Sequence, residues 1–466
     1  ARPGAGGADY DVVIVGAGVV GSAIARALSR LQISVALVDA ANDVGQGTSK
    51  ANTAILHTGF DATPGTLESR LVAEGYHLLG AYAQQTGIPV ERTGAVLVAW
   101  TEEQLATLPE LADKASQNGY HHCHQVSAEE VYTRLPALGP GALGGLVVPG
   151  EAIICTWTTT LALATEAVRN DVVLHLEHEL VEVRTHGEIT TVRTSNGELT
   201  TRWLINAAGL GADVIDRMLG YDRFTVTPRR GELLVFDKLA RPRVPMIVLP
   251  VPSKAGKGVL VSPTVYGNVM LGPTAEDLTD KTATGTSEEG FAFLADKGTQ
   301  LMPDLFDEEV TAAYAGLRAS IESKDYLIET DPEQRYILIG GIRSTGLTAS
   351  MAIAEHVLGL LGDSGEPLPP KAVVGDPPKM PYIGEVAQRP YADPERIAAD
   401  ADYGQILCFC ERVTAGEVRD ALTATIPARD RSGLSRRTRA TNGRCQGFYC
   451  GAEIQARLDR AGQDRG

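Results

Sequence analysis

The stretch that decides the fold is DVVIVGAGVVGSAIARALSRLQISVALVD, residues 11–39. A short apolar run at Val12–Val15 is followed by a second one at Val35–Val38, which ends at Asp39. Between them stand three glycines in the spacing G-x-G-x-x-G: Gly16, Gly18 and Gly21. Apolar runs bounded by glycine are typical of buried parallel strands, and the alanine-rich segment after the glycines suits a tightly packed helix. The stretch therefore predicts the strand, glycine turn, helix, strand and acid of a dinucleotide-binding unit.

Each part of this unit has a physical role. Gly16 allows the tight turn, Gly18 lets the backbone approach a pyrophosphate, and Gly21 lets helix and strand pack closely. The start of the helix supplies free N–H groups and the positive end of a dipole to the phosphates. Asp39 is placed to accept hydrogen bonds from a ribose. A βαβ unit that serves packing alone is the alternative interpretation.

Length, composition and charge narrow the class of protein. A chain of 466 residues with 44% hydrophobic and 21% charged residues predicts a globular protein of two or three domains. No apolar run approaches the roughly 20 residues of a membrane span, and residues 1–8 read as a flexible tail without a signal-peptide core. We therefore expect a cytoplasmic protein, with peripheral membrane attachment through a partner left open. The net charge of −16 argues against a nucleic-acid partner.

Apolar periodicity predicts the remaining elements. Helices are expected at 66–86, 102–117, 127–135, 156–170, 211–219, 288–302 and 346–361. Strands are expected at 94–100, 172–176, 180–185, 190–195, 198–204, 203–209 and 336–341, and in a glycine- and proline-rich antiparallel stretch over 228–271. Asn196-Gly197 is a hairpin signal, whereas the small, polar segment Gly45–Gly59 reads as a loop.

The C-terminal part differs from the rest in charge and in cysteine content. Residues 403–466 carry a net charge of +4, so the preceding residues carry −20, and the Pro- and Gly-rich segment 363–402 reads as a surface linker. Four of the six cysteines lie in the last 60 residues: Cys408, Cys410, Cys445 and Cys450. Disulfides would be unusual in a large chain of this kind, so ligation of a metal or a cluster is favoured. The C-x-C and C-x4-C spacings depart from the C-x-x-C pairs of zinc sites.

Four motifs stand in the order found in FAD-dependent oxidoreductases of the D-amino-acid oxidase superfamily. They are Gly16–Asp39, SKANTAILHTG at 49–59, LINAAG at 204–209 and GGIRSTGLTAS at 340–350. Over residues 9–362 the chain most resembles glycerol-3-phosphate dehydrogenases, in particular the flavin subunit of the anaerobic enzyme. The L-2-hydroxyglutarate dehydrogenases share the pattern HTGFDATPGTLESRL at 57–71. Residues 403–466 resemble the bacterioferritin-associated-ferredoxin-like domain that is fused to that flavin subunit and holds a [2Fe–2S] cluster.

The resemblance implies an α/β fold in three parts. A Rossmann-type FAD-binding domain would take residues 9–75, 150–225 and 325–362. An inserted, antiparallel β-rich substrate domain would take 76–149 and 226–324. After the linker at 363–402, a small helical [2Fe–2S]-binding domain would take 403–466.

The resemblance also implies the contacts of both cofactors, FAD and the cluster. The expected FAD-binding residues are Gly16, Gly18, Gly21, Asp39, Thr48, Ser49, Lys50, Ala51, Asn52, Val181, Ala207, Ala208, Gly209, Gly341, Ile342, Gly346, Leu347 and Thr348. Val181 would contact the adenine through its backbone, and Gly340 begins the closing segment, where a helix N-terminus would stabilise the anionic reduced flavin. The four clustered cysteines would hold the two irons.

Three residues are the expected catalytic groups. His57 suits the base that takes a hydroxyl proton while hydride goes to flavin N5; a structural histidine or a covalent flavin link are its alternatives. Arg318 would anchor the anionic group of the substrate and Arg343 would be a second clamp, with surface ion pairs as the alternative. Lys254 and Arg230 are weaker candidates. Relatives of the aerobic type carry an arginine and a tyrosine after this histidine, where Phe60 and Asp61 stand here, which leaves phosphate specificity open.

These residues predict a dehydrogenase of a small anionic hydroxy compound, with glycerol 3-phosphate as the first expectation. Electrons would pass from the flavin to the cluster and then to an electron-accepting protein or a quinone-linked subunit. The alternatives are a dehydrogenase of L-2-hydroxyglutarate, of another 2-hydroxy acid or of an amino or imino acid, and a non-enzymatic redox sensor or electron-transfer subunit. The sequence leaves open whether the chain forms oligomers.

Overall fold

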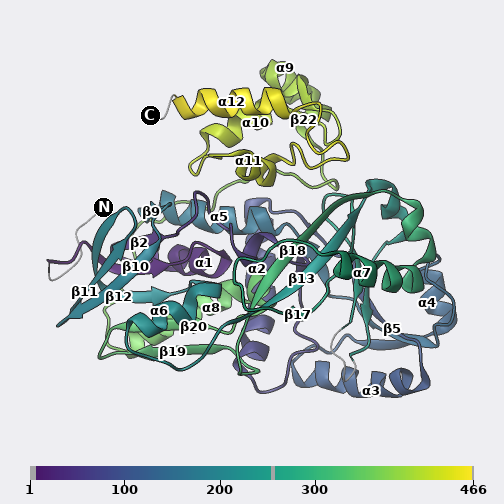
Figure 1. The fold of residues 1–466 in the computed structure, drawn as a ribbon, viewed down its shortest axis with the longest axis horizontal. Coiled ribbons are helices and arrows are strands. Elements are labelled where there is room, and N and C mark those ends of the chain that lie inside the picture. The colour runs from purple at the N-terminus through teal and green to yellow at the C-terminus, as the bar shows by residue number, and fades with distance from the viewer. Residues whose placement is uncertain (1–6, 253–257, 464–466) are drawn as a thin grey trace.

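The computed structural model describes residues 7–252 and 258–463, so most of the expected N-terminal tail and the candidate Lys254 lie outside the described residues. Two large sheets with their helices lie side by side, and a small helical domain sits above both of them (Figure 1). None of the helices in the described ranges is long and apolar enough to cross a membrane.

The first sheet is the predicted dinucleotide-binding sheet. In spatial order its strands are β9 (Val173–His175), β2 (Val35–Val38), β1 (Tyr10–Val15), β12 (Gly197–Asn206), β20 (Tyr336–Gly340) and β19 (Leu327–Asp331). The first five pair in parallel, whereas β19 is antiparallel to β20. An antiparallel arm of β10 (Leu180–His186) and β11 (Ile189–Thr194) extends the first half of β12, through the predicted hairpin at Asn196-Gly197.

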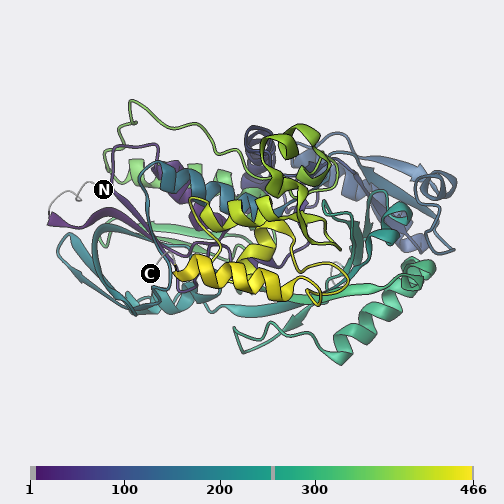
Figure 2. The same cartoon turned by 90° about the horizontal axis from the view of Figure 1, so that it is seen from above.

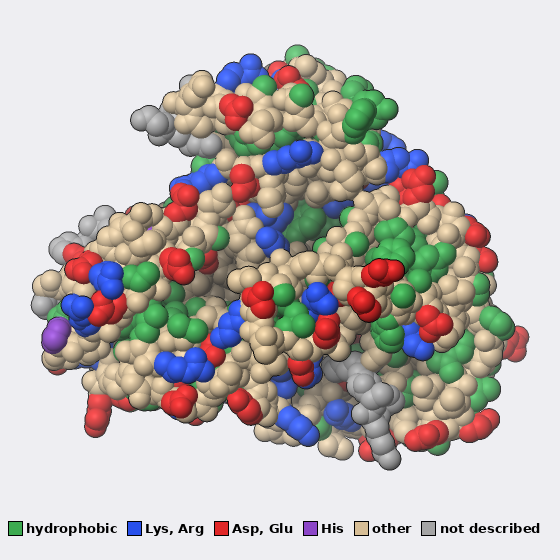
Figure 3. Space-filling model, in the orientation of Figure 1, with side chains coloured by type: hydrophobic (Ala, Val, Ile, Leu, Met, Phe, Trp, Pro, Cys, Tyr) green, Lys and Arg blue, Asp and Glu red, His purple; other side chains and the backbone are tan. Residues whose placement is uncertain are grey.

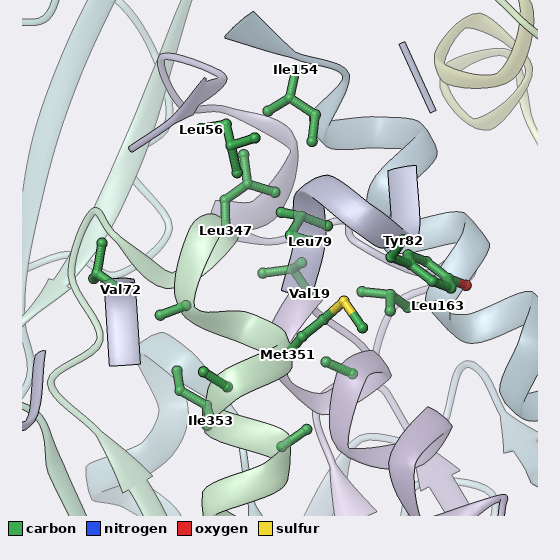
Figure 4. Close-up of a cluster of buried hydrophobic side chains, with 14 of the residues drawn as sticks. Val19, Leu56, Val72, Leu79, Tyr82, Ile154, Leu163, Leu347, Met351 and Ile353 are labelled. Carbon is green, nitrogen blue, oxygen red and sulfur yellow. The ribbon is translucent and has the colours of Figure 1, made fainter. Parts of the chain in front are cut away.

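Helices pack against this sheet around a shared apolar core (Figure 4). They are α1 (Val19–Leu28), α2 (Leu67–Thr86), α5 (Thr156–Arg169) and α8 (Gly346–Asp363). Helix α6 (Ala212–Met218) contacts the same sheet outside this core. Buried side chains from three of the helices meet in the shared core, including Leu79, Leu163 and Met351. A Cβ at Gly75 of α2 would lie 2.2 Å from the Thr348 carbonyl oxygen, so α2 and α8 approach closely only because residue 75 is glycine. Helix α2 runs through the predicted domain boundary at 75/76 without a break, and the division into domains stays a prediction.

The second sheet joins two segments far apart in the chain. In spatial order its strands are β17 (Glu276–Asp277), β13 (Thr227–Phe236), β16 (Val269–Gly272), β15 (Leu260–Pro263), β14 (Ile247–Pro250), β5 (Ala95–Ala99), β7 (Gly144–Val148) and β6 (His124–Ser127), and β18 (Val310–Ser320) pairs along β13. Its helices are α3 (Glu102–Gln117), α4 (Ala128–Arg134) and α7 (Glu288–Leu301). The expected antiparallel sheet is confirmed, except that β14 meets β5 in parallel.

The segment expected as a loop at 45–59 contains two short regular elements. These are the 3-10 turn η2 (Thr48–Lys50) and the strand β3 (Ile55–Leu56), which pairs with β8 (Ala152–Ile154) beside β4 (Val90–Glu91). The strand has only two residues and lies in a segment of small, polar residues, so its apolar run was too short to predict a strand. The pairing fixes the direction of the chain just before His57.

The C-terminal domain lies over α5 and the second sheet (Figure 2). Its main elements are α9 (Pro394–Ala399), β21 (Ile406–Cys408), β22 (Val413–Thr414), α10 (Ala415–Thr423), α11 (Arg431–Thr438) and α12 (Gly451–Gln463). Asp43, which follows β2, accepts hydrogen bonds from Arg436 at 2.7 Å and Arg437 at 2.6 Å, and all three side chains are buried. The end of the expected linker packs with this domain, since Arg389 is 3% exposed and pairs with Glu417.

Candidate functional site

One cavity lies between the carboxyl ends of the first sheet and the face of the second sheet. Gly231 and Leu233 of β13 and Gly316 and Arg318 of β18 form the wall from the second sheet. The opposite wall and the ends consist mainly of residues predicted to bind the cofactor: Gly16, Gly18, Asp39, Thr48, Ser49, Ala51, Asn52, Ala207, Ala208, Gly209, Ile342, Gly346 and Leu347. The structure therefore brings most of the predicted cofactor residues to one place, at the sheet edge where α/β folds bind ligands.

The glycine turn needs its glycines for direct steric reasons. Gly16 has a φ of +107°, and a Cβ there would lie 2.3 Å from the Ala207 carbonyl oxygen. A Cβ at Gly21 would lie 1.8 Å from the carbonyl oxygen of Gly16. The Val19 N–H at the start of α1 donates to Ser49 Oγ at 2.9 Å. This turn, with a helix N-terminus beside it, fits the pyrophosphate of a dinucleotide.

Asp39 is held at the edge of this cavity by the backbone. Its carboxylate accepts hydrogen bonds from the Ala17 N–H at 2.6 Å and the Ala41 N–H at 2.8 Å. Burial is the largest influence on its pKa, which is raised. The position suits the predicted ribose contact, which stays a prediction.

Several predicted cofactor residues are not among the described residues that line this cavity: Gly21, Lys50, Val181, Gly341 and Thr348. Gly21 contributes through packing, because it lets α1 approach the carbonyl oxygen of Gly16. Val181 lies on β10 at an irregularity in the pairing with β11, and its side chain is 40% exposed. Thr348 Oγ1 accepts a hydrogen bond from the His57 backbone N–H at 3.0 Å, which ties the start of α8 to the loop after β3. The contacts assigned to these residues stay predictions.

The loop of predicted cofactor residues 48–52, called the cofactor loop below, packs directly on β18. Thr48 donates to the Leu317 carbonyl at 2.7 Å, and Tyr314 donates to the Asn52 carbonyl at 2.9 Å. A Cβ at Gly316 would lie 2.0 Å from the Ala51 carbonyl oxygen, so glycine permits this contact. The loop therefore lines the cofactor cavity and contacts the second sheet at the same time.

His57 is paired with a carboxylate that the sequence analysis missed. Its Nδ1 lies 3.0 Å from Glu151 Oε2, and the Glu151 side chain is fully buried. Glu151 also accepts hydrogen bonds from Thr58, at 2.6 Å from the backbone N–H and 2.8 Å from the hydroxyl. A histidine oriented by a buried carboxylate is a recurring arrangement for a general base. The signal in the sequence was weak: a single acid after a glycine, directly before the apolar run of β8.

The two predicted arginine clamps differ in their surroundings. Arg318 lines the cavity, and within the described residues its side chain has no hydrogen bond or ion pair; burial, and secondarily Arg229, lower its pKa. Arg343 also lines the cavity, but its guanidinium is bonded to Glu68 and to the Lys324 carbonyl. The structure therefore offers Arg318 to an anionic ligand and gives Arg343 a competing partner.

Arg230, the weaker candidate, is turned away from this role. It is paired with Glu232 at 3.2 Å and with Glu276, and it does not belong to the described lining of the cavity. Its guanidinium holds β13, β17 and the loop before α7 together, because it also donates to the Gly285 carbonyl. The interpretation of Arg230 as a substrate contact is therefore disfavoured.

The four C-terminal cysteines form two neighbouring pairs, Cys408 with Cys450 and Cys410 with Cys445. No group of three or more His, Cys, Asp or Glu side chains in the described ranges is arranged around a single metal ion. Two pairs suit a cluster whose two irons each take two thiolates. Backbone N–H groups of the turn after Cys445, that of Tyr449 above all, lower the pKa of the Cys445 thiol and favour the thiolate that a cluster requires.

Comparison with protein families identifies both parts of the chain. Residues 11–360 match a family described as FAD dependent oxidoreductase, and residues 406–460 match a BFD-like [2Fe-2S] binding domain. A glycerol 3-phosphate dehydrogenase of Caloramator mitchellensis is 35% identical over 450 residues, which cover 96% of this chain and 93% of the relative.

Two further comparisons cover smaller shares of the chain. The structure of dithionite-reduced L-α-glycerophosphate oxidase from Mycoplasma pneumoniae with FAD bound is similar at a TM-score of 0.75 and 30% identity, covering 80% of this chain and 99% of that one. A mitochondrial L-2-hydroxyglutarate dehydrogenase of Arabidopsis thaliana is 27% identical over 399 residues, covering 74% of this chain and 82% of the relative.

Proposed function

The chain belongs to the FAD-dependent oxidoreductase family, and from that premise we propose that it oxidises glycerol 3-phosphate at its secondary alcohol, with the C-terminal domain as the exit for electrons. It is an oxidoreductase whose cofactors are FAD and a [2Fe–2S] cluster. When bound, FAD supplies the hydride acceptor and the cluster supplies a one-electron carrier. The other steps belong to side chains of the protein.

The observation that carries the proposal is the environment of Arg318. Arg318 is half-buried, and a guanidinium that is partly removed from water without an anionic partner is unfavourable, so an anionic ligand offsets that free energy. The planar fork of arginine matches the oxygens of a phosphate in a bidentate way. Arg318 lies in the same cavity as the glycine turn, so a ligand anchored there reaches the cofactor site.

The second arginine supports glycerol 3-phosphate over a dicarboxylate. Among the described residues that line the cavity, Arg318 and Arg343 are the only cationic side chains, and Arg343 is engaged by Glu68. One available guanidinium suits a substrate with one anionic group, whereas L-2-hydroxyglutarate carries two carboxylates. The proposed preference for a substrate with one anionic group thus follows from the Arg343–Glu68 ion pair, which occupies the second arginine.

His57 is the proposed base and Glu151 is its positioning residue. Because the carboxylate of Glu151 faces Nδ1, the neutral imidazole carries its proton there and its lone pair on Nε2. As the C–H bond of the alcohol breaks with loss of hydride, the hydroxyl proton passes to Nε2 and the ketone forms. The buried carboxylate then stabilises the imidazolium.

The test of the substrate is reduction of the bound flavin without oxygen. Holoenzyme is mixed anaerobically with glycerol 3-phosphate, L-2-hydroxyglutarate, proline and D-amino acids in turn, and the flavin absorbance is followed. We expect rapid bleaching by glycerol 3-phosphate and slow or absent bleaching by the others. Faster bleaching by another compound would assign that compound as the substrate, and no bleaching by any of them would favour a redox-sensing role.

The electron exit is tested separately with Cys408→Ser. The substitution removes one thiolate of the cysteine pairs, so reoxidation by a one-electron acceptor should fall far more than reduction of the flavin by substrate. Cys123→Ser is the matched control, because Cys123 lies outside the C-terminal domain. Reoxidation by the Cys408→Ser enzyme at the parental rate would overturn the relay.

A further inference from the structure

A second and larger cavity, of about 1200 Å³, lies between the cofactor loop, the second sheet and helix α11 of the C-terminal domain. Figure 3 shows a hollow beneath that domain, with basic side chains around its mouth. Thr48, Ala51 and Asn52 line both cavities, so the loop is a partition between them. On the far rim Gln446, from the loop that joins Cys445 to Cys450, donates to the Thr311 carbonyl at 2.7 Å. The second cavity therefore lies between the two predicted cofactor sites.

The charge of this cavity is one-sided. Its described lining contains five cationic side chains and no aspartate or glutamate: Lys50, Lys281, Arg431, Arg436 and Arg439. The chain as a whole has a net charge of −16, so this concentration of positive charge opposes the overall trend. A cavity lined by one sign of charge attracts ligands of the opposite sign.

The carboxylates that balance some of these cations lie behind the wall. Arg436 is paired with Asp43, Arg439 with Glu411, and Lys281 with Asp213. These ion pairs fix the cationic groups in place.

Two cations of the cavity have neutral partners. Lys50 donates to Gln46 Oε1 at 3.0 Å, and Arg431 donates to the Gln446 carbonyl at 3.1 Å. Desolvation, followed by repulsion from Arg436, lowers the pKa of Lys50, although Asp430 acts in the opposite direction. An anion in the cavity would relieve this repulsion.

One part of the remaining wall is aromatic and apolar, and neutral polar side chains line the rest. Trp157 stacks on Tyr266 with ring centroids 5.0 Å apart, and Met270 and Val235 continue the surface. Small-molecule sites typically combine an apolar wall with a few fixed polar groups in about 300–1,000 Å³. The cavity is large enough for such a ligand. Its cationic and apolar walls favour a ligand that carries both an anionic group and an apolar surface.

We propose that this cavity binds a small phosphate-bearing molecule with a flat apolar body, of the mononucleotide class. The phosphate would lie among Lys50, Arg431 and Arg436, and the flat body would lie along Trp157, which Tyr266 supports from within the wall. The site is distinct from the substrate site, since Arg318 belongs to the other cavity. A ligand here would contact the cofactor loop on one side and the loop that joins Cys445 to Cys450 on the other.

The test is calorimetric titration of the holoenzyme with AMP, flavin mononucleotide, adenosine and inorganic phosphate, so that no turnover is needed. We expect at least one mononucleotide to bind about tenfold more tightly than phosphate or adenosine, because only it uses both walls. Lys50→Gln and Arg431→Gln should each weaken that binding about tenfold, the size of one charge-assisted contact. Lys297→Gln, on α7 outside the cavity, is the matched control.

Binding of mononucleotide by Arg318→Gln at the parental affinity supports the proposal and separates it from the substrate site. Three results would overturn it: neither mononucleotide binds at millimolar concentration, neither Lys50→Gln nor Arg431→Gln weakens binding, or inorganic phosphate binds as tightly as the mononucleotides. Displacement of the nucleotide by glycerol 3-phosphate, at the concentrations that reduce the flavin, would also overturn it by assigning the cavity to substrate.

Discussion

The two walls of the cofactor cavity are built in different ways. On the first sheet the wall consists of backbone and glycine, at Gly16, Gly18 and the start of α1. On the second sheet the one charged side chain in the described lining is Arg318; His57, which follows β3 and is not among the described lining residues, depends on Glu151. The glycine turn of the first wall has no room for a Cβ at Gly16, whereas recognition on the second wall depends on the charge of Arg318. Substitutions should therefore fail in different ways on the two sides.

The largest effect is expected on the backbone wall. Gly21→Ala places a Cβ 1.8 Å from the Gly16 carbonyl oxygen, so the glycine turn must move and nearly all bound FAD should be lost. Gly47→Ala is the matched control: Gly47 also lines the cavity, but an added Cβ meets nothing within 4 Å. The measurement is flavin absorbance per polypeptide after purification. Equal flavin content in the two variants would contradict the steric role of Gly21.

The next effect concerns the positioning carboxylate. Glu151→Gln should keep FAD but lower kcat by about 100-fold, within the range of a general base that has lost its orientation. A neutral amide no longer favours the protonated imidazole, so the acidic limb of the pH–rate profile should move to lower pH. Glu129→Gln, an exposed glutamate on α4, is the control. An unchanged profile with reduced kcat would indicate that Glu151 only maintains the local structure.

A smaller effect is expected for Asp39. Asp39→Asn replaces the charged acceptor of the Ala17 and Ala41 N–H groups, while the glycine turn remains. We expect FAD affinity to fall about tenfold, the size of one charge-assisted hydrogen bond. Titration of the apoprotein with FAD measures it. A loss as complete as that of Gly21→Ala would mean that the side chain, rather than the backbone, dominates this wall.

The same difference between the walls explains what the sequence could predict. The glycine turn, the strands around it and the hairpin at Asn196-Gly197 depend on neighbours in the chain, and the structure confirms them. The partner of His57 lies 94 residues away and the partner of Arg343 lies 275 residues away. Local patterns carry no information about such pairs.

The boundaries of the domains were harder to predict for a related reason. Helix α2 begins next to the first sheet and continues past residue 75, because its apolar face packs on α8 along its length. The end of the expected linker is rich in proline yet holds the buried Arg389–Glu417 pair. Composition indicated a surface segment only at 363–402, and there long-range packing buries the Arg389–Glu417 pair.

The most direct test of the central claim is the selectivity for phosphate in two arginine variants. The measured quantity is kcat/KM for glycerol 3-phosphate divided by kcat/KM for glycerol, under anaerobic conditions with a dye acceptor. Because Arg318 is the available anchor and Arg343 is engaged by Glu68, Arg318→Gln should lower this ratio by about 100-fold and Arg343→Gln by less than about tenfold. An unchanged ratio in Arg318→Gln, or a larger loss in Arg343→Gln, would contradict the assignment of Arg318 as the residue that recognises the substrate.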